Sequence, residues 1–287
     1  MKMERLVRAS TRAPLHLVII VIALIWISPS AGMLISSFRP QQDIINSGWW
    51  TVFQHPFNFT QYTLDNYIRV VGQEGIGRAF LNSLTITVPT TLLTITVAAL
   101  AAYAFAWMEF RGRQFLFMIV IGLIVIPLQM TLIPVLRMFN SLGLSGTFLG
   151  IWLAHTGYGL PFMIFLLRSF FGGLPAELFE SAFLDGASRL TAFLRLLLPL
   201  SVPVLASAAI FQFLWVWNDL LVALVYLGGF ERVAPVTLKL SLLVGSRGQD
   251  WHLFTAAAFV SMILPLAVFF ALQRYFVSGI LAGSVKG

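Results

Sequence analysis

Six long apolar runs constrain this chain more than any other feature of its sequence. Each run reaches the roughly 20 residues that an α-helix needs to cross a lipid bilayer. They occupy residues 15–35, 79–107, 115–136, 148–167, 204–227 and 253–276. Because backbone polar groups inside lipid must be paired within the segment itself, apolar runs of this length predict helices. The sequence therefore predicts an all-α integral membrane protein with six transmembrane helices.

The composition agrees with this class. Hydrophobic residues make up 59% of the 287 residues and charged residues only 10%, whereas a soluble domain has about a quarter charged residues. The formal net charge of +7 does not indicate nucleic-acid binding, because lysine and arginine collect on the cytoplasmic side of membrane proteins and set their orientation. The chain has no cysteine, which excludes disulfides, thiolate nucleophiles and thiolate metal sites.

The positive charges predict that both ends of the chain lie in the cytoplasm. With six spans and an inner N-terminus, eleven of the 18 Lys and Arg residues fall inside and seven outside. The excess is clearest on the N-terminal region and the short loops, where the rule applies best. The N-terminal region also resembles a signal peptide, and residues 28–31 resemble a cleavage site. Its apolar run is longer than the usual 7–15 residues, which favours an uncleaved first helix.

These boundaries divide the chain into three parts. Residues 1–14 are a predicted cytoplasmic N-terminus, residues 15–276 a six-helix transmembrane domain, and residues 277–287 a cytoplasmic tail. Inside the transmembrane domain, residues 38–78 and 228–252 are predicted external loops and residues 169–203 a predicted cytoplasmic loop. The sequence shows no strong internal repeat and no separate soluble domain.

The polar interval 174–203 is predicted to form two short helices on the membrane surface. Pro175 suits a helix start, where its missing N–H costs nothing. Glu180 lies in the first turns, where the helix dipole favours a negative charge. Asp185–Gly186 favours a turn between the two helices, and Pro199 helps to end the second.

The same interval resembles the cytoplasmic EAA loop of ABC importer permeases. The family pattern reads roughly E-A-A-x-x-D-G-A, followed by an aromatic residue and a proline. Here ESAFLDGA matches it, with Ser181 in place of the middle alanine. The resemblance implies a coupling helix docked in a groove of an ATPase subunit, and the alternative is an ordinary interfacial amphipathic helix. The residues implied in ATPase coupling are Glu180, Ser181, Ala182, Asp185, Gly186, Ala187, Phe193 and Pro199.

The resemblance covers almost the full length of the chain. Several segments resemble the carbohydrate importers within this class in particular. The tail 278–287 and the segment Trp217–Asp219 resemble the second permease subunit of the maltose-importer class. Segments 146–155, 210–224 and 245–248 resemble its alpha-glucoside branch. In the maltose class the tail reaches the ATPase interface, and most sugar contacts lie in the other permease subunit. The implied ATPase-contacting residues of the tail are Ser278, Gly279, Gly283 and Lys286.

The resemblance implies one permease subunit of an ATP-driven importer in a bacterial or archaeal cytoplasmic membrane. It would move an oligosaccharide or an alpha-glucoside, such as maltose, trehalose or sucrose, by alternating access. The implied partners are a second permease in a heterodimer, two ATPase subunits and an external sugar-binding protein.

The chain itself shows no sign of an enzyme. It lacks G-x-x-x-x-G-K-[ST], so ATP and magnesium are expected on the ATPase partners and no cofactor on this chain. Its four histidines are scattered without the spacing of a zinc site. His155, in the fourth span, is predicted to be a hydrogen-bonded packing residue. Neither catalytic nor metal-ligating residues are predicted.

Polar groups inside the spans are the candidates for a solute pathway, because burying them in lipid is costly. Amides, carboxylates and aromatic rings are also the groups that bind sugars. The fifth span places four of them close to one helical face: Gln212, Trp215, Asn218 and Asp219. Helix–helix hydrogen bonding or a gate contact is the alternative for this cluster. Asn82 and Gln129 are further pathway candidates, with packing as their alternative.

Two other functions remain compatible with the sequence. An ion-coupled secondary sugar transporter needs ionisable residues inside the membrane, and only Asp219 is offered. Such transporters commonly also have more spans, arranged as repeats. An accessory membrane subunit would assemble partners without moving solute. Uptake that stops with vanadate but continues with an uncoupler would distinguish the ATP-driven importer from both.

Overall fold

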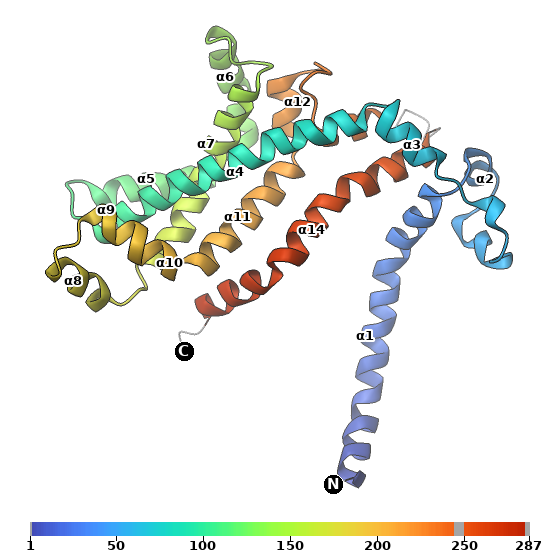
Figure 1. Cartoon of the computed structure of the whole chain (residues 1–287), viewed down its shortest axis with the longest axis horizontal. Coiled ribbons are helices and arrows are strands. Elements are labelled where there is room, and N and C mark those ends of the chain that lie inside the picture. The colour runs from blue at the N-terminus through green and yellow to red at the C-terminus, as the bar shows by residue number, and fades with distance from the viewer. Residues whose placement is uncertain (1, 244–249, 285–287) are drawn as a thin grey trace. The chain divides into compact units, whose positions relative to one another are not determined.

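The computed structural model describes residues 2–243 and 250–284, which form helices joined by short connections (Figure 1). In chain order the elements are α1 (Lys2–Ser37), α2 (Gln41–Asn46), η1 (Trp49–Gln54), η2 (Phe59–Gln61), α3 (Asp65–Gly72), α4 (Ile76–Trp107), α5 (Arg113–Val125), α6 (Leu128–Ser141), α7 (Phe148–Phe171), α8 (Ala176–Leu184), α9 (Arg189–Ala192), η3 (Phe193–Leu197), α10 (Leu198–Leu200), α11 (Val202–Trp217), α12 (Leu221–Leu227), α13 (Val236–Leu243) and α14 (Trp251–Ser284). These two ranges contain no strand. The predicted all-α class is therefore confirmed.

Four helices of the described ranges are long and apolar enough to cross a membrane. They are Pro14–Ser37 within α1, α4, α7 and Trp251–Ala271 within α14. Two bent pairs also pass when each is taken together: α5 with α6, bent by 102°, and Arg189–Leu200 with α11, bent by 78°. The integral-membrane prediction is confirmed, while the structure gives four spans, or up to six if each bent pair is one span.

Two of the predicted spans are interrupted. The third breaks at Pro127, whose ring leaves no N–H to continue the helical hydrogen bonds, so α5 ends at Val125 and α6 begins at Leu128. The fifth breaks between α11 and α12 at residues 218–220. Non-helical backbone at membrane depth is tolerated only where protein buries it or where it lines a cavity. Both breaks are largely exposed in this chain, so we expect them to line a cavity or to be covered by another subunit.

The last helix is longer than predicted. The sixth apolar run was expected to end at residue 276, but α14 continues to Ser284. No proline or charge interrupts residues 277–284, so nothing in the sequence stops the helix there. Ser278, Gly279 and Gly283 thus belong to α14, while Lys286 and the segment 245–248 lie outside the described residues.

The chain divides into two compact units. The first contains Met1–Gly77 and Leu240–Val260, and the second contains Arg78–Lys239 and Ser261–Gly287. In the first unit, the guanidinium of Arg39 donates to the carbonyls of Ser47 and Gly48. The amide of Asn66 donates to the carbonyls of Ser37 and Arg39, both at 2.9 Å. These bonds order the predicted external loop after α1 as short helices.

In the second unit, α7 contributes to two hydrophobic cores. Near its C-terminal end, Phe171 belongs to a core that includes Phe179 of α8. Near its N-terminal end, Ile151 belongs to a core with Phe139 of α6 and Tyr226 of α12. The surface helices α8–α10 thus lie at one end of the unit, and α6 with α12 at the other (Figure 1).

Candidate functional site

The surface helix α8 buries a single side chain, the ring of Phe179, against the rest of the second unit. Phe179 is 1% exposed and stacks on Trp107 at the end of α4, with ring centroids 4.0 Å apart. The indole N–H of Trp107 donates to the carbonyl of Phe171 at the end of α7, at 3.1 Å. The position of α8 therefore depends on the ends of two long helices.

Tyr103 of α4 fixes the second half of the same loop. Its hydroxyl donates to the carbonyl of Arg189 at 3.0 Å, and its ring lies 5.3 Å from the ring of Phe193. Phe193 begins the π-helical turn η3 and is buried, whereas Pro199 of α10 is exposed. Of the predicted coupling residues, Phe193 thus points inward.

Asp185–Gly186 forms the predicted bend between α8 and α9. Gly186 has a φ of +80°, in the left-handed region that glycine adopts without strain. Its N–H donates to the carbonyl of Phe183, and the next N–H, of Ala187, donates to the carbonyl of Ala182, both at 3.0 Å. This pair of bonds is the Schellman motif that ends helices. A Cβ added at Gly186 would meet no atom within 4 Å, so the position is restricted by its backbone and not by crowding.

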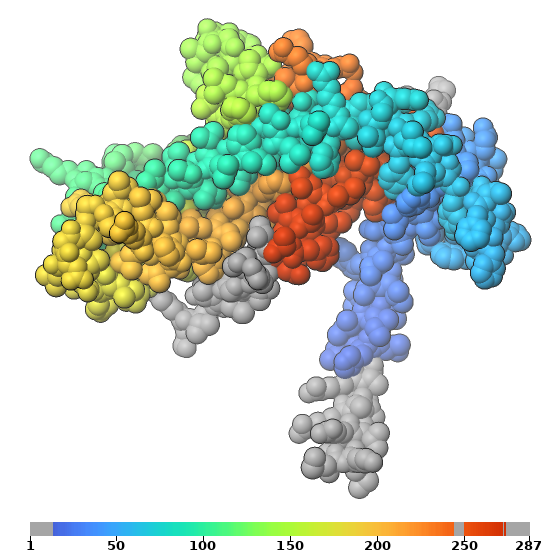
Figure 2. Space-filling model, in the orientation of Figure 1, coloured from blue at the N-terminus to red at the C-terminus, as the bar shows by residue number. Residues whose placement is uncertain are grey.

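The outer face of α8 is open. Glu180, Ser181, Asp185 and Gly186 are exposed, and Ala182 and Ala187 are half-buried. Large apolar side chains accompany them, since Leu184 is 89% and Phe183 41% exposed. Figure 2 shows α8–α10 uncovered at one edge of their unit. A mixed apolar and acidic face of this kind is typical of a protein interaction surface.

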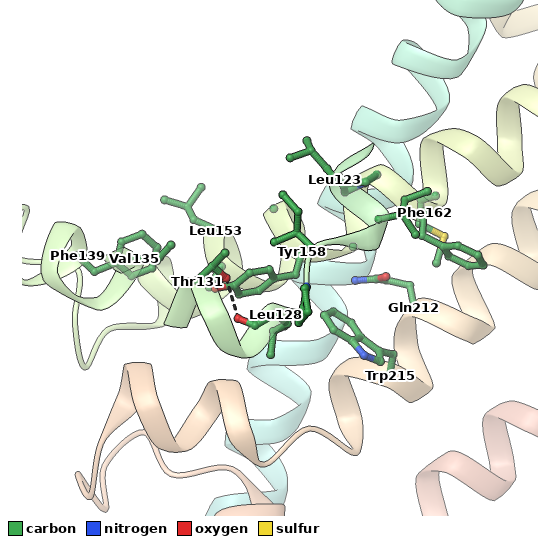
Figure 3. Close-up of a pocket in the computed structure, with 18 of the residues that line it drawn as sticks. Leu123, Leu128, Thr131, Val135, Phe139, Leu153, Tyr158, Phe162, Gln212 and Trp215 are labelled. Carbon is green, nitrogen blue, oxygen red and sulfur yellow. Dashed lines mark hydrogen bonds between the residues drawn. The ribbon is translucent and has the colours of Figure 1, made fainter. Parts of the chain in front are cut away.

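A cavity of about 910 Å³ lies at the break between α5 and α6. Its walls are residues 123–128 at the break, the middle of α7 around Tyr158 and the part of α11 around Gln212 (Figure 3). Every lining residue is uncharged. The cavity therefore offers no counter-charge to an ionic solute, and its few polar groups suit a neutral one.

Three hydroxyl groups from three helices form a chain beside the cavity. The hydroxyl of Tyr158 lies 3.0 Å from Thr131 Oγ1 and 2.6 Å from the hydroxyl of Tyr226. Thr131 and Tyr158 line the cavity, as Figure 3 shows. Tyr226, which is 1% exposed, is buried behind them. The buried Tyr226 therefore holds the orientation of the half-buried Tyr158.

Gln212 and Trp215 reach the cavity from the opposite wall. Figure 3 shows both side chains extending from α11 towards Tyr158. The Gln212 amide N–H donates to Thr94 Oγ1 at 3.4 Å. The Trp215 ring meets the ring of His155 edge-on, with centroids 5.4 Å apart. Two of the four polar residues predicted on the fifth span are thus on the cavity wall.

The other pathway candidates do not line the cavity. The side-chain amide of Asn218 donates to the carbonyl of Leu214 at 2.8 Å. The Asp219 carboxylate accepts the backbone N–H groups of Val222 and Ala223 at 3.2 and 3.0 Å. Gln129 is exposed outside the lining. A pathway role for these residues and for Asn82 stays a prediction.

Asn82 holds the segment that follows α12. Its amide donates to the carbonyls of Arg232 and Ala234, both at 3.0 Å. In the same segment, Lys239 Nζ lies 2.6 Å from Glu231 Oε1 and holds the pKa of that carboxyl below its usual value. The geometry of Asn82 is that of a packing residue.

Thr131 and Tyr158 were not among the sequence candidates. A threonine and a tyrosine in apolar spans look like ordinary packing residues. One signal was available, since Tyr158 lies in Gly157-Tyr-Gly-Leu-Pro161, where small residues and a proline allow close approach and a local opening of the helix. Among the described residues, no group of three or more His, Asp or Glu could hold a metal ion.

Comparison with known proteins decides the family. Residues 72–281 match the family described as binding-protein-dependent transport system inner membrane component. The chain belongs to this family. The permease is 64% identical to the osmoprotective compounds uptake permease protein GgtD of Synechocystis sp., over 96% of this chain and 92% of that protein. It is 41% identical to the alpha-glucoside transport system permease protein AglG of Rhizobium meliloti, over 97% of this chain and 99% of that protein.

The fold has a solved counterpart. The crystal structure of a bacterial ABC transporter involved in the import of the acidic polysaccharide alginate matches the permease with a TM-score of 0.73. The match covers 94% of this chain and 98% of the other, at 21% sequence identity, and so concerns the fold alone. The predicted ABC importer permease class is confirmed, and with it a multi-pass membrane subunit that is not an enzyme and that depends on a separate binding protein.

Proposed function

We propose that this permease is one of two membrane subunits of an ATP-driven importer for a neutral alpha-glucoside or related oligosaccharide. One relative is named for alpha-glucosides and a more similar one for osmoprotective compounds. Trehalose and sucrose meet both descriptions, because they are neutral, very soluble and contain an alpha-glucosyl group. Maltose belongs to the same chemical group.

The observation that carries the proposal is the uncharged cavity at the broken third span. Sugars bind through hydroxyls that donate and accept hydrogen bonds and through C–H faces that pack on aromatic rings. The cavity offers the hydroxyls of Thr131 and Tyr158, the amide of Gln212 and the ring of Trp215. Small-molecule sites typically have volumes of roughly 300–1,000 Å³ and mostly apolar walls with few polar groups, and this cavity fits that description.

The exposed face of α8 supports coupling to an ATPase. The chain has no phosphate-binding loop, so the proposed ATP and magnesium sites lie on two ATPase subunits. These subunits would hold Glu180–Ala187 from the cytoplasm, and closure around ATP would move α8 and the helices attached through Trp107. The spans would then open outward to a binding protein loaded with sugar. The end of α14 and both chain termini lie on the same cytoplasmic side in this arrangement.

The test is uptake by the complete importer reconstituted in liposomes, with ATP inside and the binding protein outside. We expect radiolabelled trehalose, sucrose or maltose to accumulate only with ATP, to stop with vanadate and to continue with an uncoupler. The same sugar should raise ATP hydrolysis. Accumulation driven by an ion gradient without ATP would instead support a secondary transporter, and co-purification without any uptake would support an accessory subunit.

Two substitutions on α8 separate attachment from ATPase contact. Phe179→Ala removes the ring stacked on Trp107, and loss of a buried phenylalanine costs about 3–5 kcal/mol. We expect faster hydrogen exchange of α8 in the isolated permease and weaker sugar-stimulated ATP hydrolysis. Phe183→Ala, on the exposed face, should leave hydrogen exchange unchanged and still weaken binding of the ATPase. Equal behaviour of the two variants would contradict the proposed division of roles.

A further inference from the structure

The two walls of the cavity present complementary sets of groups on this one chain. Thr131 of α6 and Tyr158 of α7 lie on one wall, and Gln212 and Trp215 of α11 on the other (Figure 3). We propose that these four side chains form a binding site for one sugar ring on this subunit. The inference rests on the proposed function and goes further, because it assigns direct solute contact and specificity to this chain.

The hydroxyl wall is built to accept hydrogen bonds. Thr131 Oγ1 lies 2.8 Å from the carbonyl of Leu128 and 3.0 Å from the hydroxyl of Tyr158, so its single proton is already engaged. The 2.6 Å contact with Tyr226 engages a second proton of the chain. Each hydroxyl oxygen can accept two bonds, so Thr131 and Tyr158 retain capacity for donors from a solute. Sugar hydroxyls are such donors.

The position of the Gln212 amide depends on the absence of a side chain at residue 159. A Cβ at Gly159 would lie 2.7 Å from both terminal atoms of the Gln212 amide. Glycine at this position therefore leaves the space that the amide occupies. Gln212 is 1% exposed overall, and its long bond to Thr94, at 3.4 Å, uses only part of its hydrogen-bonding capacity. An amide supplies both donors and an acceptor, which complements the acceptors opposite.

The backbone of α7 has one carbonyl in the cavity lining that lacks its usual helical donor. Pro161 has no N–H, so the carbonyl of Gly157 receives no helical bond from it. Both residues line the cavity. Trp215 supplies an aromatic face beside the amide, held by the edge of His155. A hydrocarbon chain would use none of these polar groups, whereas a sugar ring uses the hydroxyls, the amide, the carbonyl and the ring together.

Two glycines within apolar helices provide a matched test in the reconstituted importer. Gly159→Ala would displace the Gln212 amide, while a Cβ at Gly122 of α5, which does not line the cavity, meets no atom within 4 Å. With trehalose as the probe, we expect Gly159→Ala to raise the KM for uptake on the order of tenfold, as for loss of one or two hydrogen bonds. The maximal rate should stay within about twofold, and Gly122→Ala should change neither value by more than about twofold.

Tyr158→Phe tests the opposite wall without a change of shape, and Tyr67→Phe, in the first unit, is its control. The wild-type importer should take up one monodeoxy trehalose, the analogue that lacks the hydroxyl bound by Tyr158, less well than trehalose. Tyr158→Phe should take up both sugars equally, whereas Tyr67→Phe should keep the wild-type difference. Unchanged KM values in both Gly159→Ala and Tyr158→Phe, with wild-type uptake of trehalose, would overturn the site and leave the proposed function intact. Wild-type importer that takes up neither trehalose, sucrose nor maltose would overturn both.

Discussion

Replacement of Gly186 by proline is expected to abolish solute uptake and leave any remaining ATP hydrolysis uncoupled from it. Proline fixes φ near −65°, whereas Gly186 has a φ of +80° and donates its N–H to the carbonyl of Phe183. The forced backbone and the lost donor together cost about 3 kcal/mol or more. Since each 1.4 kcal/mol is a factor of ten, the native bend should be depleted on the order of 100-fold.

Gly186→Ala is a milder substitution at the same position. It keeps the N–H, and its Cβ would meet no atom within 4 Å, so only the left-handed backbone is penalised, by about 1–2 kcal/mol. We expect partial uptake with alanine and none with proline, measured alongside vanadate-sensitive ATP hydrolysis and recovery of the assembled complex. Normal uptake by the proline variant would contradict the role proposed for the bend.

The bend could be predicted from sequence because its causes are local. Asp185–Gly186 stops one helix and Ser188 starts the next, where its hydroxyl accepts the N–H of Thr191 at 3.1 Å. The contact that holds α8 in place could not be predicted in the same way. Phe179 looks like any apolar residue of an amphipathic helix, and its partner Trp107 is distant in the chain. Pairing of that kind follows from packing, which a single sequence does not contain.

The cavity residues also divide into those that the sequence could predict and those that it could not. Gln212 and Trp215 are three residues apart on one helix, so periodicity alone places them on one face. The periodicity fails at Asp219, because α11 ends at Trp217 and the helical face does not continue. Thr131 and Tyr158 come together only because the chain turns by 102° between α5 and α6. Pro127 predicts an interruption there, but neither the angle nor what it brings into contact.

Removal of the Asp219 carboxylate is expected to cost stability more than substrate affinity. Asp219→Ala would leave the N–H groups of Val222 and Ala223 without their acceptor at the start of α12. Loss of an N-cap alone costs about 1 kcal/mol, and unpaired backbone groups away from water cost more. His155 would also lose the carboxylate oxygen that lies 3.6 Å from its Nε2. We expect a total near 2 kcal/mol, seen as a lower melting temperature of the purified complex.

Asp219→Asn separates the two roles that the sequence left open for this residue. Asparagine keeps one acceptor oxygen where the carboxylate offers two, so a structural role predicts a smaller loss of stability than in Asp219→Ala and an unchanged KM for sugar. A carboxylate that binds sugar predicts instead a raised KM, because the solute contact would lose a charged acceptor. Asp219 lies outside the cavity lining and its oxygens already hold α12. A large rise in KM would therefore move the solute path from the break at Pro127 to the break at Asp219.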